Sequence, residues 1–232
     1  IISTSALMFL LFFNYGKNLF WAFKQMGEHK KHLAKIKGLK FYKFLGTGKK
    51  PGFRLSPDFK TYAFLSSWKS KEDQIKFYKF HNYFQEFKKK SKSIRFIEIE
   101  TISCNGLWNN IKPFIPSKNI KKSDLSNNKI AVLTRGAVKF SKSINFWLSI
   151  GAASKAISNA KGVSFFKGIG ELPLFEQATF SIWNDIDCIN KFAYQNKIHS
   201  NIIKKSQSQK WYSEDLFARF LIKSDKTLTY KI

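Results

Sequence analysis

Hydrophobic and polar positions along this 232-residue chain switch between the period of a strand and that of a helix. Alternation across 178–183 predicts a strand with Phe180 and Thr179 on opposite faces. Apolar positions at helical spacing then predict a helix that begins at Asn184 or Asp185. The same order of one strand, a helix, two strands, a helix and a final strand can be followed through both halves of the chain.

The two halves match at several points, which indicates an internal repeat. Corresponding helices begin at Phe20 and Phe146 and end at Gly38 and Gly162. In the first half we expect strands at 2–13, 39–45, 61–68 and 94–104 and helices at 17–36 and 72–89. In the second half we expect strands at 130–140, 163–169 and 178–183, helices at 143–160 and from 186 onwards, and a last strand or helix-strand pair around 216–223.

This order of elements is that of a ferredoxin-like unit, whose sheet carries helices on one face and leaves the other bare. Two such sheets can cover each other's bare faces. The sequence therefore predicts an α+β fold in which two ferredoxin-like repeats form an α+β barrel. We expect the first repeat at 1–104 and the second at 129–232, joined by a linker at 105–128 that is rich in Asn, Lys and Pro.

The net charge distinguishes this chain from most enzymes. The chain has 41 Lys and Arg and 15 Asp and Glu, which gives a net charge of +26. Such a balance predicts attraction to nucleic acid or to an anionic membrane surface. The alternative is a compositional bias, since Lys, Asn, Ile and Phe are all abundant. The charge is spread along the chain and no recognition helix is evident, so nucleic acid is the least favoured partner.

The cysteines and the longest apolar run indicate the cellular compartment of the protein. Cys104 and Cys188 lack metal-ligand spacing, which favours free thiols in a reducing compartment. The run at 6–13 is far shorter than the roughly 20 residues of a membrane span, and it lacks the flanks of a secretory signal. We therefore expect a cytoplasmic protein that contacts the membrane at most peripherally.

Candidate chemistry centres on one histidine, because the chain has no P-loop, Rossmann, nucleophile-elbow or HExxH pattern. The Gly-x-Gly turns at 46–48 and 168–170 occupy matching repeat positions, which favours hairpins over phosphate binding. His199 follows the second-half helix and precedes Ile202 and Ile203, where an imidazole could reach inward to haem iron. An ordinary surface histidine is the alternative.

Arg135 falls on the apolar face of its predicted strand, together with Leu133 and Ala137. A charge on an apolar face needs a partner. A haem propionate is one candidate, because guanidinium binds carboxylates in a bidentate manner. A salt bridge to Glu171 or Glu176 is the other.

Lys167 is a weaker propionate candidate. Aromatic side chains could line a long apolar substrate pocket, although such residues more often form a core. The candidates for this pocket are Phe165, Phe180, Trp183, Trp211 and Phe217.

The run FFKGIGELPLFEQATFSIWND at 165–185 resembles the characteristic region of the spheroidene monooxygenase family, the acyclic carotenoid ketolases. Segments at 19–27, 38–48, 131–137 and 211–220 agree with that family in order, so the resemblance covers nearly the whole chain. Two departures stand out. The chain is more basic than the family, and 105–128 matches nothing in it.

The resemblance implies an oxygen-dependent monooxygenase that contains haem b and receives electrons from a donor such as ferredoxin. It implies oxidation of an apolar, carotenoid-like substrate at C-2 to a ketone, and a relation to haem-binding dimeric α+β barrel proteins. In that case His199 would bind the iron, Arg135 and Lys167 the propionates, and Trp183 and its aromatic neighbours the polyene. A haem enzyme of another type, such as a dehydratase, or a haem carrier is the alternative.

Overall fold

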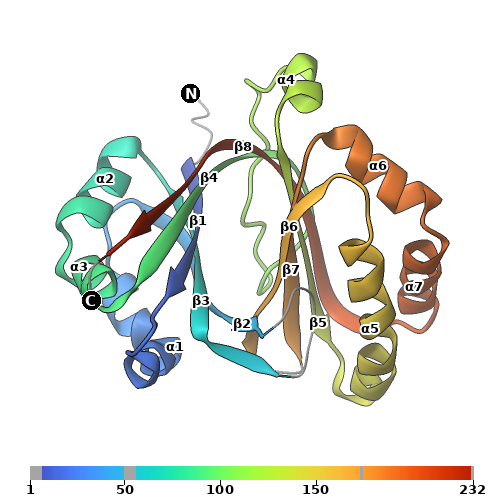
Figure 1. Ribbon diagram of the computed structural model, residues 1–232, viewed down its shortest axis with the longest axis horizontal. Coiled ribbons are helices and arrows are strands. Elements are labelled where there is room, and N and C mark those ends of the chain that lie inside the picture. The colour runs from blue at the N-terminus through green and yellow to red at the C-terminus, as the bar shows by residue number, and fades with distance from the viewer. Residues whose placement is uncertain (1–6, 50–55, 173–174, 231–232) are drawn as a thin grey trace. The chain divides into compact units, whose positions relative to one another are not determined.

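The computed structural model describes residues 7–49, 56–172 and 175–230. Within them the chain forms two compact units, and each unit combines a four-stranded sheet with helices (Figure 1). The first unit comprises 1–47, 58–100 and 222–232, and the second comprises 48–57 and 101–221, so the chain passes between the units inside β-strands after Glu100 and after Leu221. The part of the predicted first strand before residue 7 lies outside the described residues.

The first unit has the ferredoxin-like order that the pattern predicts. Its strands are hydrogen-bonded in the order β4-β1-β3-β2, and the printed registers of β1 with β3 and with β4 are antiparallel. The strands are β1 (Leu7–Asn14), β2 (Leu39–Gly48), β3 (Pro57–Trp68) and β4 (Ser93–Gly106). The helices are α1 (Leu19–Leu33), α2 (Lys71–Phe80) and α3 (Asn82–Lys90).

The second unit repeats this order as β8-β5-β7-β6, again with antiparallel registers. Its strands are β5 (Ile130–Val138), β6 (Val163–Leu172), β7 (Glu176–Trp183) and β8 (Tyr212–Thr229). Its helical segments are α4 (Lys122–Asn127), η1 (Phe140–Lys142), α5 (Ser143–Ser158), α6 (Ile186–Gln195) and α7 (Lys197–Ser208). The hydrogen-bonded strand order of the whole chain closes on itself, so the predicted α+β barrel of two ferredoxin-like repeats is confirmed.

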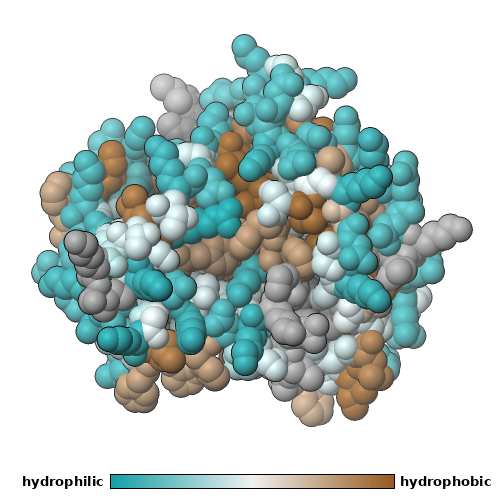
Figure 2. Space-filling model, viewed as in Figure 1, coloured by the Kyte–Doolittle hydropathy of each residue, from teal (hydrophilic) through white to brown (hydrophobic). Residues whose placement is uncertain are grey.

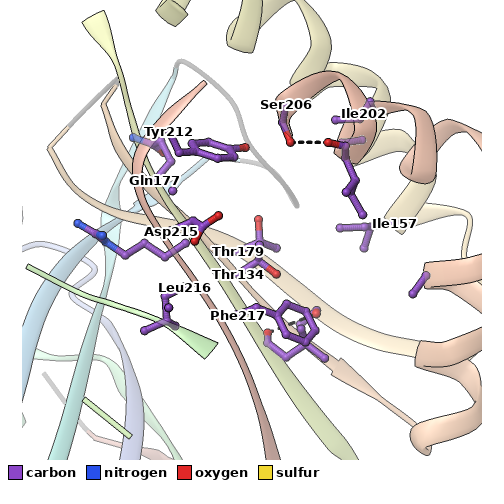
Figure 3. A pocket seen from close by; sticks show the side chains of 18 of the residues that line it. Thr134, Ile157, Gln177, Thr179, Ile202, Ser206, Tyr212, Asp215, Leu216 and Phe217 are labelled. Carbon is purple, nitrogen blue, oxygen red and sulfur yellow. Dashed lines mark hydrogen bonds between the residues drawn. The ribbon is translucent and has the colours of Figure 1, made fainter. Parts of the chain in front are cut away.

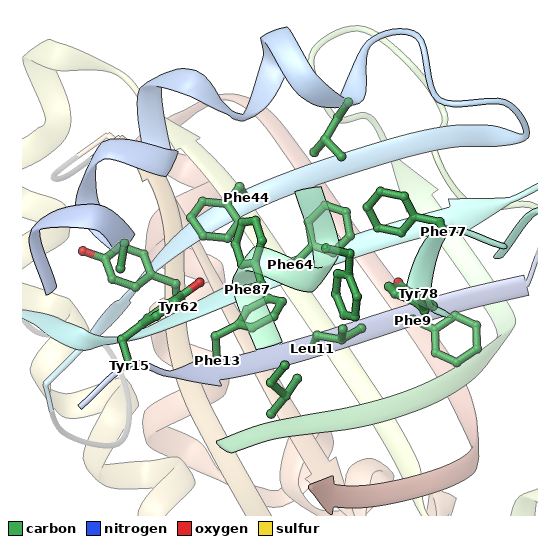
Figure 4. Close-up of a cluster of buried hydrophobic side chains, with 14 of the residues drawn as sticks. Phe9, Leu11, Phe13, Tyr15, Phe44, Tyr62, Phe64, Phe77, Tyr78 and Phe87 are labelled. Carbon is green, nitrogen blue, oxygen red and sulfur yellow. The ribbon is translucent and has the colours of Figure 1, made fainter. Parts of the chain in front are cut away.

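Aromatic rings fill the space between the sheet and the helices of the first unit (Figure 4). Phe44 stacks on Tyr62 with ring centroids 5.7 Å apart. The ring centroid of Phe87 lies 5.0 Å from that of Phe13 and 5.6 Å from that of Phe44. Each such ring contributes about 1.5–3 kcal/mol by its burial. This unit is therefore held together by a solid aromatic core.

One prediction about an element is wrong. The helix expected at 72–89 is interrupted at His81, whose backbone is extended (φ −73°, ψ 124°) and whose ring caps α3 by accepting from Tyr83 N–H. Residues 105–128, which have the composition of a linker, belong to the second unit. Trp108 and Phe114 are each 1% exposed, and the Phe114 ring lies 5.3 Å from that of Phe220.

Candidate functional site

A cavity of about 700 Å³ lies within the second unit, between one face of its sheet and helices α5, α6 and α7. This volume falls in the range of cofactor and small-molecule sites, roughly 300–1,000 Å³. Its apolar walls include Val132, Phe146, Ile157, Trp183, Ile189, Phe192, Ile202 and Phe217. The cavity is therefore the candidate functional site of the chain.

Small side chains on the sheet keep this space open. Thr134 and Thr179 are cross-strand partners in β5 and β7, and they project toward the space bounded by Ile157 and Ile202 (Figure 3). Gly136 follows on β5, where a Cβ would lie 2.4 Å from the Tyr212 ring. Only glycine at this position lets that ring border the cavity.

A shared hydrogen bond fixes how the two repeats correspond. Trp68 Nε1 donates to Ser66 Oγ at 3.1 Å at the end of β3, and Trp183 Nε1 donates to Ser181 Oγ at 2.9 Å at the end of β7. Each pair is buried and spans two residues of its strand. Counting back from these tryptophans aligns β3 with β7 residue by residue.

In this alignment the first unit has large side chains where the second has small ones. Phe64 corresponds to Thr179, and its cross-strand partner Leu11 corresponds to Thr134. The next partners, Phe13 and Tyr62 in the first unit, correspond to Gly136 and Gln177 in the second. The equivalent cavity of the first unit measures only about 10 Å³. The same architecture is thus filled in one repeat and hollow in the other.

Thr179 is a polar group without a partner in this apolar space. Its side chain is 5% exposed, and its Oγ1 has no hydrogen-bond partner among the residues that the structure describes. Leaving a buried hydroxyl unpaired costs roughly 1–3 kcal/mol. An oxygen atom of a bound ligand could accept from this hydroxyl and recover that free energy.

Basic side chains border the cavity near the start of β8. Lys139 N–H donates to Trp211 C=O at 2.9 Å, which brings Lys139 beside the residue that follows Lys210. Both lysines border the cavity, together with Tyr212. Burial, and secondarily the charge of Asp215, raises the pKa of Tyr212 to about 12, so its phenol stays neutral at physiological pH. Lys139 and Lys210 favour carboxylate groups in this part of the cavity, where Asp215 is the one acidic residue among the described residues that line it.

Arg135 is held by carboxylates of its own unit. It forms ion pairs with Glu214 and with Glu176, the latter at 3.7 Å, and its guanidinium lies 5.2 Å from the centre of the Trp108 ring. The salt bridge to Glu176, one of the two alternatives for Arg135, is therefore present. Strand alternation places Arg135 on the sheet face opposite Thr134, but Arg135 is still among the residues that border the cavity.

Glu214 is the main partner of Arg135 and is anchored by the backbone as well. Asn109 and Asn110 adopt positive φ values of 54° and 61°, and their N–H groups donate to its carboxylate at 2.8 and 2.7 Å. Burial would raise the pKa of Glu214, but these hydrogen bonds and Arg135 hold that pKa below its ordinary value. The guanidinium is thus neutralised without any ligand.

The structure brings only part of the predicted substrate pocket together. Trp183 and Phe217 line the cavity. Phe165 and Lys167 pair in register with Ile182 and Phe180, which places them on the opposite face of the sheet with Phe180 itself. Trp211 is fully buried in a cluster with Phe146, where the ring centroids are 6.2 Å apart. The cavity walls described here therefore do not include Phe165, Lys167, Phe180 or Trp211.

His199 lies in the first turn of α7, a helix that the sequence pattern did not predict. Its backbone position shares a helical face with Ile202, Ile203 and Ser206, all of which border the cavity. The side chain of His199 lies outside the described residues. Among the side chains that are described, no group of three or more His, Cys, Asp or Glu is arranged to hold a metal ion.

No family model matches the chain, but it is similar to curated spheroidene monooxygenases. It is 29% identical to that of Rhodobacter capsulatus over 208 residues, which cover 90% of this chain and 86% of the relative. It is 32% identical to that of Cereibacter sphaeroides over 211 residues, covering 90% of this chain and 64% of the relative. The chain thus spans less than two thirds of the Cereibacter protein.

Solved structures of aldoxime dehydratases share the fold. One covers 97% of this chain and 85% of its own, with a TM-score of 0.62 and 8% identity. A second, in complex with butyraldoxime, covers 94% and 79%, with a TM-score of 0.58 and 8% identity. At such identity the likeness concerns the fold alone. By sequence, along nine-tenths of its length, the chain is a homologue of the spheroidene monooxygenases.

Proposed function

We propose that this protein is a haem-dependent monooxygenase that oxidises an apolar, carotenoid-like substrate, as the names of its relatives suggest. The observation that carries the proposal is the cavity of the second unit, where Thr134, Gly136 and Thr179 stand in place of the large side chains of the first unit. An aromatic core that is hollowed in only one of two repeats costs stability. A ligand that binds in the hollow would recover it.

The walls of the cavity suit haem b, which joins an apolar ring to a pair of carboxylates. Apolar side chains from α5, α6 and α7 would pack on the ring. Lys139 and Lys210 would neutralise the carboxylates, in place of Arg135 and Lys167. Position 199 of α7 would supply the imidazole, because it lies on the helical face that borders the cavity.

Bound haem would supply the activation of oxygen, while the protein positions the substrate and excludes water. Trp183, Ile189 and Phe192 would keep water from the reacting carbon, because they close one side of the cavity with apolar surface. The unpaired Thr179 hydroxyl would donate to the oxygen introduced by a first oxidation. That hydrogen bond would hold the same carbon in place for the second oxidation, as ketone formation requires.

Haem binding is tested by absorption spectroscopy. The protein reconstituted with haem b should show a Soret band, and His199→Ala should lose or shift this band while its circular dichroism is unchanged. His32→Ala is the matched control, because His32 is exposed in the first unit and stacks on Tyr83. A protein that takes up no haem, or an unchanged Soret band in His199→Ala, would overturn the assignment of the ligand.

Activity separates the proposed reaction from the alternatives. With oxygen and a reduced ferredoxin-type donor, the reconstituted protein should convert an acyclic carotenoid in detergent to its ketone. Turnover that needs no reductant would indicate a dehydratase-like reaction. Transfer of haem to apomyoglobin without any turnover would indicate a carrier. That a protein such as ferredoxin donates the electrons, and that this protein is cytoplasmic, remain predictions.

The hollow itself can be closed with the residues of the other repeat. The double variant Thr134→Leu and Thr179→Phe restores the pair found at Leu11 and Phe64. We expect haem binding to weaken more than tenfold while the protein remains folded. Thr227→Phe, on an exposed part of β8, is the control and should bind haem normally. Normal haem binding by the double variant would place the cofactor elsewhere.

A further inference from the structure

An apolar ridge lies along the outer side of η1 and α5, and we call it the α5 ridge. It consists of Phe140, Ile144 and Leu148, which are 82%, 75% and 79% exposed. Their spacing of four residues places Ile144 and Leu148 on one side of α5, and Phe140 lies in η1 directly before it. Phe175 extends the ridge by stacking on Phe140, with ring centroids 5.9 Å apart. Single exposed apolar residues are ordinary, but a contiguous group marks an interaction site.

The α5 ridge is directly connected to the cavity through its own helix. The opposite side of α5 lines the cavity with Phe146, Ala153 and Ile157. Lys139, which precedes the ridge by one residue, also borders the cavity. Apolar groups project from the edge at which α5 lies (Figure 2). Helix α5 thus lies between the exposed apolar surface and the proposed substrate site.

The surroundings of the α5 ridge are cationic. No Asp or Glu occurs from Leu125 to Gly170, whereas Lys139 and Lys142 lie beside the ridge. The acidic groups near Phe175 are engaged elsewhere. Glu171 accepts from Trp108 Nε1, and Glu176 pairs with Arg135. An anionic partner is therefore favoured by charge, and a second copy of this chain, itself at +26, is disfavoured.

We propose that the α5 ridge inserts into the surface of an anionic lipid bilayer and that apolar substrate passes from the bilayer past α5 into the cavity. The route of the substrate rests on the proposed function, whereas insertion does not. Phe140, Ile144 and Leu148 would enter the acyl boundary, while Lys139 and Lys142 contact the phosphates. Among the described helices none is both long and apolar enough to cross a membrane.

Vesicle flotation tests the insertion. The protein should float with vesicles that contain phosphatidylglycerol, and less with pure phosphatidylcholine. Ile144→Ser and Leu148→Ser should each weaken vesicle binding about tenfold, because each removes an apolar side chain that the proposal buries in the bilayer. Lys142→Gln should weaken binding about fivefold, and only to the anionic vesicles. Tyr194→Ser is the matched control, because Tyr194 is 80% exposed on α6 and outside the α5 ridge.

Activity measurements distinguish a failure of membrane insertion from a failure of the proposed function. Ile144→Ser and Leu148→Ser should retain activity on substrate in detergent but lose it on substrate embedded in vesicles. Ridge variants that bind vesicles as well as Tyr194→Ser does would overturn the proposal, and so would binding that ignores lipid charge. A concentration-dependent dimer that these variants abolish, seen by analytical ultracentrifugation without vesicle binding, would assign the ridge to self-association instead.

Discussion

At the scale of single residues, Arg135 shows how a charge is accommodated on an apolar strand face. Arg135 is 3% exposed, and its guanidinium contacts Glu214, Glu176 and the Trp108 ring. Two of these partners, Glu214 and Trp108, come from segments distant in sequence. The sequence alone left a propionate and a salt bridge as equal candidates, because the position of Glu214 on a later strand could not be read from it.

Removal of the Arg135 charge should destabilise the protein. Arg135→Gln leaves Glu214 and Glu176 without their cation, so we expect the free energy of unfolding to fall by about 3–5 kcal/mol. Arg95→Gln is the control, because Arg95 forms a bidentate pair with Asp225 in which each side chain is 26% exposed. There we expect at most about 1 kcal/mol. Equal losses in the two variants, measured by urea denaturation, would contradict the role given to Arg135.

His81 should make stability depend on pH. Burial, and secondarily the charge of His32, lowers the pKa of His81. The unfolded chain therefore takes up the proton first, and stability is lost as pH falls through the ordinary histidine pKa of about 6.5 toward the lowered folded value. His81→Asn retains a helix cap but does not titrate. Its stability should fall less between about pH 7.5 and 5.5, and an unchanged pH profile would refute this assignment.

At the scale of elements, side-chain volume on two equivalent strands separates a core from a site. β3 carries Phe64 and β7 carries Thr179 at the same place relative to the buried Ser-x-Trp pair. Backbone pairing is the same in both, so the architecture of the strands does not decide which unit is hollow. A comparison of the two repeats in the sequence could have found Thr134 and Thr179, once the Ser-x-Trp pairs were used to align them.

The difference in packing between the two units should appear as a difference in the free energy of unfolding when an aromatic side chain is truncated. Phe64→Ala, in the closely packed first unit, should lower the free energy of unfolding by about 3–5 kcal/mol. Phe217→Ala should cost less, because Phe217 is only half-buried and borders the cavity, so one side of its ring already lacks contacts. Thermal and urea unfolding would measure both. A Phe217→Ala loss as large as that of Phe64→Ala would mean that the cavity is not open.

Helices were predicted less well than strands. Alternation identified β7 to the residue at its C-terminal end, Trp183, although both faces of the strand are buried over 178–183. The break at His81 was missed, since continuous apolar spacing conceals a single extended residue. α7 was missed because its apolar positions are few and its polar residues are mixed, so tertiary packing decides it.

At the scale of the whole molecule, the charge of +26 should oppose folding through self-repulsion. Raising NaCl from about 10 mM to about 150 mM shortens the Debye length from about 30 Å to about 8 Å and screens this repulsion. We expect Tm to rise by about 2–4 °C, which corresponds to roughly 1 kcal/mol for a chain of this size. Differential scanning calorimetry would measure it. A Tm that falls with NaCl would show that local ion pairs outweigh the repulsion.

The sequence by itself determined the fold class, the two repeats and the relationship to spheroidene monooxygenases, because periodicity and local motifs are properties of neighbouring residues. Only the tertiary structure decided which repeat is hollow, which carboxylates hold Arg135, and that Phe165, Phe180 and Lys167 lie away from the cavity. These outcomes depend on strand register and on contacts between distant segments. A shift of one residue in register would exchange the two faces of the sheet and therefore the residues that line the site.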